Sequence, residues 1–225
     1  ARSAVMGQTL QELLEPVAPA DEPAPEDVPD SGALAEAAES VVKITGTAFE
    51  CGVNQTGSGF VAAHHRVITN AHVVAGVAQP VVNTQDGRAL PARVVHFDAD
   101  GDLAVLAVDG LDLEPIPLGE GLEAGDEAAF LGYPAGGPFR AAGATVQSLA
   151  TVRVDNIYGA DPSPLSVYQL AAEVEQGNSG GPLLETDGEL SGVVFAKAQG
   201  ADPVGYALSL FEVGPVVRGA ASYVD

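Results

Sequence analysis

A serine stands among glycines in the segment Gly177–Pro182, which reads GNSGGP. A serine hydroxyl becomes a nucleophile when a neighbouring base takes its proton. The flanking glycines permit the tight backbone that presents such a serine. They also let the amides of Gly177 and Ser179 converge where a carbonyl oxygen would gain negative charge. The segment predicts a nucleophilic Ser179 with an oxyanion hole, and the alternative is a glycine-rich turn with an incidental serine.

Two further segments provide a base and an acid. His72 lies in the segment Thr69–Val74, which comes just after a short apolar strand-like run. Asp102 directly precedes the apolar run Leu103–Leu106. A histidine exchanges a proton near neutral pH, so it can serve as a general base. A buried aspartate that accepts a hydrogen bond from the ring fixes the tautomer and stabilises the imidazolium. We therefore expect His72 and Asp102 to act with Ser179.

The order of the three residues along the chain narrows the class of enzyme. His72, Asp102 and Ser179 follow the order histidine, aspartate, serine, which is that of chymotrypsin and differs from that of subtilisins and α/β-hydrolases. Asp98 and Asp100 compete with Asp102 for the role of the acid. We favour Asp102 because it directly abuts the apolar run.

Short strand-like runs must position these side chains. The 27 glycines and 16 prolines favour many turns and an all-β fold. Six such runs precede the connector 109–125 and six follow it, which predicts two small β-barrels. The runs are Val41–Thr47, Gly59–Ala62, Arg66–Thr69, Val81–Asn83, Arg93–Phe97, Leu103–Val108, Glu127–Leu131, Ala144–Val154, Leu165–Leu170, Pro182–Leu184, Leu190–Ala196 and Gly205–Leu208.

The expected organisation has three parts. Residues 1–31 form an amphipathic segment, helical over 4–14, followed by an acidic, proline-rich tether. Residues 32–118 form the first barrel with His72 and Asp102, and residues 119–225 form the second barrel with Ser179. The catalytic cleft is expected between them.

Helices are expected only near the two ends of the chain. Ser31 is a suitable N-cap for a short helix over Ala33–Glu39. Near the C-terminus, Ser209–Ala221 has helical spacing that Gly214-Pro215 interrupts, so a kinked or two-piece helix is expected there.

The charge balance excludes one class of partner. With 31 acidic and 9 basic residues the chain carries a net charge of −22. Binding to nucleic acid relies on Lys and Arg, so no nucleic-acid partner is expected. No run approaches the roughly 18 apolar residues that span a bilayer, so any anchor would lie upstream of this chain.

Several segments together resemble trypsin-like proteases of the bacterial HtrA type. The resemblance implies an all-β fold of two six-stranded antiparallel β-barrels with the three catalytic residues between them. It also implies a serine endopeptidase that cleaves protein and peptide substrates without a cofactor. It covers about residues 32–212 and rests on Gly57–Phe60, Thr69–His72, Asp102–Leu106, Leu131–Pro134, Gly177–Pro182 and Gly205–Leu208.

A narrower resemblance is to the actinobacterial, membrane-anchored periplasmic proteases implicated in acid resistance. It rests on Glu173–Gly177, Asp155–Gly159 and the position of Cys51, the single cysteine. It implies an upstream membrane anchor, an extracytoplasmic location and a role in the stress response. It also implies that Cys51 is half of a disulfide whose other cysteine lies beyond residue 225.

The broader resemblance to trypsin-like proteases also implies a substrate pocket. Glu173 would lie near its floor and favour Arg or Lys side chains, while Phe195, Ala196 and Lys197 would form its wall. The alternative is that Glu173 points to solvent, because loops vary more than the scaffold.

Two other functions stay open at this level. The first is a latent or non-catalytic binding module on the protease fold, and the second is partner binding or self-cleavage through residues 1–30. His64, His65 and His96 are expected to be loop or surface residues without a metal role, since the sequence shows no clustered ligands around them.

Overall fold

The computed structural model describes residues 23–48, 53–198 and 203–224. The expected helix over 4–14 and Cys51 lie outside these ranges. The first half contains α1 (Gly32–Ala38), β1 (Val41–Ala48), β2 (Val53–Ala63), β3 (Arg66–Thr69), α2 (Ala71–Val74), β4 (Val81–Asn83), β5 (Ala89–Pro91), β6 (Arg93–Asp98) and β7 (Leu103–Ala107). The second half contains β8 (Glu127–Gly132), η1 (Pro134–Gly136), β9 (Arg140–Val154), β10 (Ser163–Ala171), β11 (Pro182–Leu184), β12 (Leu190–Lys197), β13 (Val204–Ser209), α3 (Leu210–Gly219) and η2 (Ala220–Ser222).

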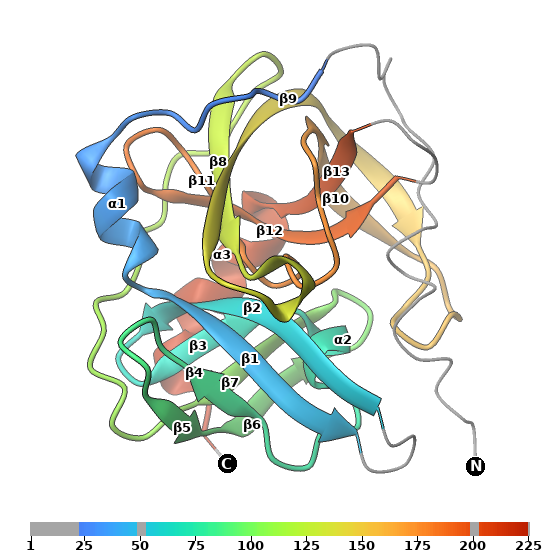
Figure 1. Cartoon of the computed structure of the whole chain (residues 1–225). Coiled ribbons are helices and arrows are strands. Elements are labelled where there is room, and N and C mark those ends of the chain that lie inside the picture. Colours follow the sequence, from blue (N-terminus) through green and yellow to red (C-terminus); the bar gives the residue numbers. More distant parts are fainter. Residues whose placement is uncertain (1–22, 49–52, 199–202, 225) are drawn as a thin grey trace.

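The strands form two curled antiparallel sheets, one in each half of the chain (Figure 1). The first has seven strands in the order β5-β4-β1-β2-β3-β7-β6, and the second is a closed barrel in the order β10-β13-β12-β11-β8-β9. The predicted fold class is confirmed, but the first sheet has one strand more than expected. The extra strand is β5, a three-residue edge strand that ends in Pro91. So short a strand has no alternating pattern, and proline is tolerated at such an edge.

The apolar side chains form a core inside each sheet and a third core that the two halves share. Along strand β7, successive side chains alternate between two of these cores. Leu103 and Val105 belong to the shared core, whereas Ala104 and Leu106 belong to the core of the first sheet. All five residues of β7 are buried, because one face of the strand contacts the first core and the other contacts the second half of the molecule.

The segment before the first strand lies against the second barrel. Ser31 caps α1 by accepting a hydrogen bond from the Leu34 amide at 3.4 Å, and Leu34 is buried in the shared core. Upstream, the backbone of Asp27 runs against β9, where a Cβ atom on Gly143 would lie 2.4 Å from the Asp27 carbonyl oxygen. This end of the predicted tether is therefore packed on the barrel.

The C-terminal helix passes through its proline without ending. Helix α3 is continuous across Gly214-Pro215, and the backbone changes to a 3-10 helix only at Ala220. Pro215 is exposed, and so is Phe211, whose carbonyl would otherwise accept from residue 215. Water can satisfy that carbonyl, so the proline is tolerated on this outer face. Of the two expected forms, a helix divided in two at Gly214-Pro215 is wrong, and a kink there stays a prediction.

The end of the chain returns to the first sheet. The Tyr223 ring stacks on His96 with a centroid distance of 4.3 Å, and Arg66 Nη2 donates to the Tyr223 carbonyl at 3.0 Å. The C-terminal segment thus links the two halves. Within the described residues, no helix combines the length and the apolar character needed to cross a bilayer.

The shared core predicts a clear difference between two phenylalanines. Phe60 is fully buried in it, whereas Phe211 is 78% exposed. We expect Phe60→Ala to lower the free energy of unfolding by about 3–5 kcal/mol, because it leaves a cavity. The matched Phe211→Ala change should stay within about 0.5 kcal/mol. Denaturant unfolding measures both, and equal losses would contradict the shared core.

Candidate active site

Two neighbouring strands bring His72 and Asp102 together. Strand β3 pairs antiparallel with β7, with Thr69 opposite Ala104. His72 lies on α2 just after β3, and Asp102 lies just before β7. The Asp102 carboxylate therefore makes two hydrogen bonds with His72. Asp102 Oδ2 lies 2.7 Å from the ring Nδ1, and Asp102 Oδ1 accepts from the His72 backbone amide at 2.9 Å.

The pair is buried and its orientation is fixed. The side chains of His72 and Asp102 are 11% and 8% exposed. Asp102 has a left-handed backbone with φ of 51°, and its carbonyl accepts from the side-chain amide of Asn70 at 2.8 Å. An ionised carboxylate can only accept, so the ring proton lies on Nδ1 and the basic nitrogen is Nε2. Nε2 is buried and has no hydrogen-bond partner among the described residues, so the hydrogen bond that the base of such a triad makes to the serine hydroxyl is not formed in this structure.

Ser179 lies in a backbone turn that only glycines allow. Gly177 and Gly180 have φ of 97° and 86°. A Cβ atom on Gly177 would lie 2.3 Å from the Tyr133 carbonyl oxygen, and one on Gly180 would lie 2.2 Å from the Ser58 carbonyl oxygen. Positive φ and close backbone contact both exclude larger residues at these two positions.

The turn of the second barrel is held on the first sheet. The Ser58 amide donates to the Ser179 carbonyl at 2.8 Å, and the Ser58 hydroxyl donates to the Gly177 carbonyl at 2.7 Å. The Ser58 hydroxyl also accepts from the Tyr133 amide at 2.9 Å. Its carbonyl accepts from the Thr69 hydroxyl at 2.7 Å. Ser58 therefore joins the serine turn to the end of β3.

These contacts place Ser179 beside the histidine segment. A Cβ atom on Gly57 would lie 2.6 Å from the Val73 side chain and 3.2 Å from the Ser179 carbonyl oxygen, so both lie against Gly57. A Cβ atom on Gly180 would lie 3.1 Å from the Asn70 amide nitrogen. The structure thus brings His72, Asp102 and Ser179 to one buried junction between the two sheets.

The backbone before Ser179 forms an ordered hydrogen-bonded turn. The Asn178 amide donates to the Glu175 carbonyl at 3.1 Å, and the Gly181 amide donates to the Asn178 carbonyl at 2.9 Å. The Gln176 carbonyl accepts from the Ala135 amide in η1 at 2.5 Å. Contacts from η1 therefore support the loop in which the predicted oxyanion donors, Gly177 and Ser179, lie.

The competing acids are occupied elsewhere. Asp98 Oδ1 accepts from the amides of Asp100 and Gly101, each at 3.0 Å. Asp100 Oδ1 accepts from the Asn156 side chain at 3.3 Å. Of the three aspartates, Asp102 is the one whose carboxylate contacts His72.

The predicted pocket residues lie in different environments. Phe195 and Ala196 on β12 are buried in the shared core, while Glu173 and Lys197 are exposed. The neighbouring Val174 packs against the core of the second barrel. An exposed Glu173 agrees with the second of the two alternatives, in which this carboxylate faces solvent. Cys51 lies outside the described residues, so its disulfide stays a prediction.

Sequence reasoning did not assign the supporting residues. Ser58 and Tyr133 belong to segments that carried the family resemblance, but nothing in their spacing indicates that they hold the serine turn. A cavity of about 360 Å³ is lined by Tyr133 together with Lys43, Arg88, Phe139 and neighbouring residues. None of the three proposed catalytic residues lines it, so it is not the catalytic cleft.

Comparison with known sequences finds relatives that are named as serine proteases. The chain is 40% identical over 201 residues to the serine protease Rv3671c of Mycobacterium tuberculosis, covering 88% of this chain and 50% of the relative. It is 32% identical over 160 residues to a probable periplasmic serine endoprotease DegP-like of Halomonas elongata, covering 68% and 32%. The chain thus spans about half or less of the length of these relatives.

The solved structures that resemble this chain are also proteases. The Rv3671c protease in its active form superposes with a TM-score of 0.81 at 36% identity, covering 94% of both chains. Its inactive form gives 0.77 at 34%, covering 88% of this chain and 98% of that one. The HtrA-type protease AlgW with a tripeptide gives 0.70 at 30%, covering 83% and 62%.

A family profile completes the comparison. The profile described as a trypsin-like peptidase domain matches residues 57–193, a range that contains His72, Asp102 and Ser179. By this match, and by its likeness to Rv3671c and the HtrA-type proteases, the chain belongs to the trypsin-like serine protease family.

Proposed function

We propose that the chain is a serine endopeptidase that cleaves peptide bonds through His72, Asp102 and Ser179. The observation that carries the proposal is the 2.7 Å contact between Asp102 Oδ2 and His72 Nδ1. This contact directs the basic Nε2 away from the aspartate, at the junction where the Ser179 turn packs on the first sheet.

The proposed reaction passes through an acyl-enzyme. Ser179 Oγ attacks the scissile carbonyl carbon while its proton moves to His72 Nε2, and Asp102 stabilises the resulting imidazolium. The amides of Gly177 and Ser179 hold the oxyanion. The amine then leaves with the proton from Nε2. Water attacks the ester with its proton going to Nε2, and that proton returns to Oγ when the acid leaves.

The substrate pocket is proposed between the segment around Glu173 and the strand Phe195–Lys197. Glu173 is exposed, and an ion pair in that setting contributes about 1 kcal/mol or less. We therefore expect at most a modest preference for Arg or Lys at the cleaved bond.

We further propose an extracytoplasmic, membrane-tethered protein with a role in the stress response. The relative named as periplasmic supports the location. The acidic, proline-rich end of residues 1–31 suits a tether to an upstream anchor, and Cys51 suits a disulfide in an oxidising compartment.

Latency is the second candidate. Rv3671c is known in forms named active and inactive, so this chain could bind peptides without cleaving them until its serine turn is correctly placed. The first experiment below separates the two.

The nucleophile is tested by covalent labelling. A fluorophosphonate probe should label the native protein, because the activated Ser179 hydroxyl attacks phosphorus as it would a carbonyl. Ser179→Ala should abolish labelling, and Ser191→Ala, which removes another buried serine, should keep it. Mass spectrometry of the labelled peptide gives the answer. An unlabelled native protein that still binds peptide would support latency.

The acid is tested by comparing two aspartates. Asp102→Asn should lower kcat about 10⁴-fold, because the amide stabilises the wrong imidazole tautomer. Asp100→Asn removes a carboxylate whose contact is with Asn156 and should change kcat less than about threefold, as expected for changes away from the site. Steady-state peptide hydrolysis measures both, and comparable losses would remove Asp102 from the mechanism.

The serine turn is tested by two glycines with nearly the same positive φ. Gly180 and Gly87 have φ of 86° and 88°, but a Cβ atom would clash with backbone only at Gly180, since Gly87 has open space. Gly87→Ala should cost about 1–2 kcal/mol in unfolding free energy with unchanged kcat. Gly180→Ala should cost more and lower probe labelling at least tenfold. Wild-type labelling of a folded Gly180→Ala protein would refute the tight packing.

A further inference from the structure

Two histidines and an aspartate converge on the surface of the first sheet, away from the proposed catalytic residues. His64 and His65 form the turn between β2 and β3, and Asp112 follows β7. Their ligand atoms all lie within 4.8 Å of one another. The two rings stack with centroids 3.8 Å apart, and His65 Nε2 lies 3.7 Å from Asp112 Oδ1. The expectation that no ligands cluster around these histidines is therefore wrong.

The turn that carries the histidines is held in place. His65 has a left-handed backbone with φ of 58°, and its carbonyl accepts from the Val108 amide at 3.0 Å. The same carbonyl accepts from Arg66 Nη1 at 3.1 Å. Arg66 Nη2 also donates to the Tyr223 carbonyl, so the Arg66 guanidinium is held by two backbone carbonyl groups. The turn is thus fixed directly to the end of β7.

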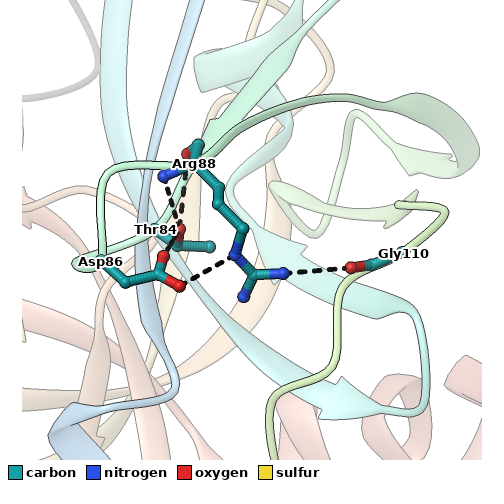
Figure 2. Close-up of polar contacts among 4 residues, drawn as sticks. All are labelled: Thr84, Asp86, Arg88 and Gly110. Atoms are coloured by element: carbon teal, nitrogen blue, oxygen red, sulfur yellow. Dashed lines mark hydrogen bonds and ion pairs between the residues drawn. The ribbon is translucent and has the colours of Figure 1, made fainter.

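The loop that carries Asp112 is anchored as well. Leu111 is fully buried, and Arg93 forms an ion pair with Asp109 at 3.1 Å. Arg88 Nη1 donates to the Gly110 carbonyl at 3.2 Å (Figure 2). These contacts fix the backbone on the N-terminal side of Asp112, so its carboxylate is presented to the histidines.

Arg88 is itself held by its own turn. Its Nε donates to Asp86 Oδ2 at 2.9 Å, and Asp86 also accepts from the Thr84 hydroxyl (Figure 2). The Thr84 hydrogen bond is the largest of the effects that lower the pKa of the Asp86 carboxyl. Asp86 therefore stays ionised as a partner for Arg88, and the Arg88 contact to Gly110 is preorganised.

The donor set matches a particular group of metal ions. Two imidazole nitrogens and one carboxylate oxygen suit Zn²⁺, Ni²⁺ or Cu²⁺, whereas Mg²⁺ and Ca²⁺ prefer oxygen alone. Ligand atoms about 2.0–2.1 Å from a tetrahedral ion lie about 3.4 Å apart. The ligand atoms, which lie up to 4.8 Å apart, therefore need to close by about 1.4 Å at most, which rotation of surface side chains allows.

We propose that His64, His65 and Asp112 form a binding site for a divalent transition-metal ion, with water completing the coordination. The ion would join the β2–β3 turn to the loop after β7. Strands β3 and β7 pair from Arg66–Ala107 to Thr69–Ala104. At the opposite end of this pair lie His72 and Asp102, about 13 Å away for a four-residue strand. The ion stabilises the strands that hold this pair and does not contact the reacting atoms.

The test measures thermal unfolding of the full chain in Zn²⁺, with EDTA-treated protein as the reference. At a Zn²⁺ concentration about 100-fold above the dissociation constant, we expect the Tm to rise by about 5 °C or more. Equilibrium dialysis should find one Zn²⁺ bound at this site per chain, and Mg²⁺ should leave the Tm unchanged.

Matched variants locate the ion. His64→Asn and Asp112→Asn should each weaken Zn²⁺ binding at least tenfold, because two ligands remain. His65→Asn, which retains a residue tolerant of positive φ, should do the same. His96→Asn and Asp187→Asn serve as controls. His96 stacks on Tyr223, and Asp187 lies in a carboxylate cluster with Glu185 and Glu189. Absence of a Zn²⁺-induced Tm shift, or a shift that survives in all three ligand variants, would overturn the proposal.

Discussion

The hydrogen bonds of Ser58 fix how the two sheets meet. This fully buried residue of β2 uses its amide, carbonyl and hydroxyl in four hydrogen bonds, to Ser179, Thr69, Gly177 and Tyr133. Buried polar groups are costly when unpaired, so any sliding of one sheet on the other would leave several of them unsatisfied. The relative position of the two halves is therefore set by polar contacts at the junction, while the shared apolar core supplies the contact area.

The proposed catalytic residues depend on this junction because they do not all come from the same sheet. His72 and Asp102 come from the paired strands β3 and β7, and their geometry is fixed within one sheet. Ser179 comes from the other, and its turn can approach the histidine only where Gly57 and Gly180 lack side chains. The glycines near the serine thus serve two purposes, a left-handed turn and close contact between backbones.

The sequence predicted the fold class and proposed the catalytic residues because both leave local signals. Apolar runs separated by turns indicate short strands, and the order of His72, Asp102 and Ser179 selects one class of protease. Other features lack such signals. Strand β5 is too short for a pattern, and the course of α3 through Pro215 depends on which face meets water. The approach of Asp112 to His64 and His65 follows from the pairing of β3 with β7, which no spacing along the chain reveals.

The return of the C-terminus to the first sheet has a mechanical consequence. Tyr223 stacks on His96 and accepts from Arg66, while α3 packs on β12 and β13. The chain therefore crosses between the halves three times: from the segment before β1, which lies on the second barrel, through the connector, and through the C-terminal segment. Three separate crossings resist rotation about any one of them, so the chain itself opposes a hinge motion between the halves.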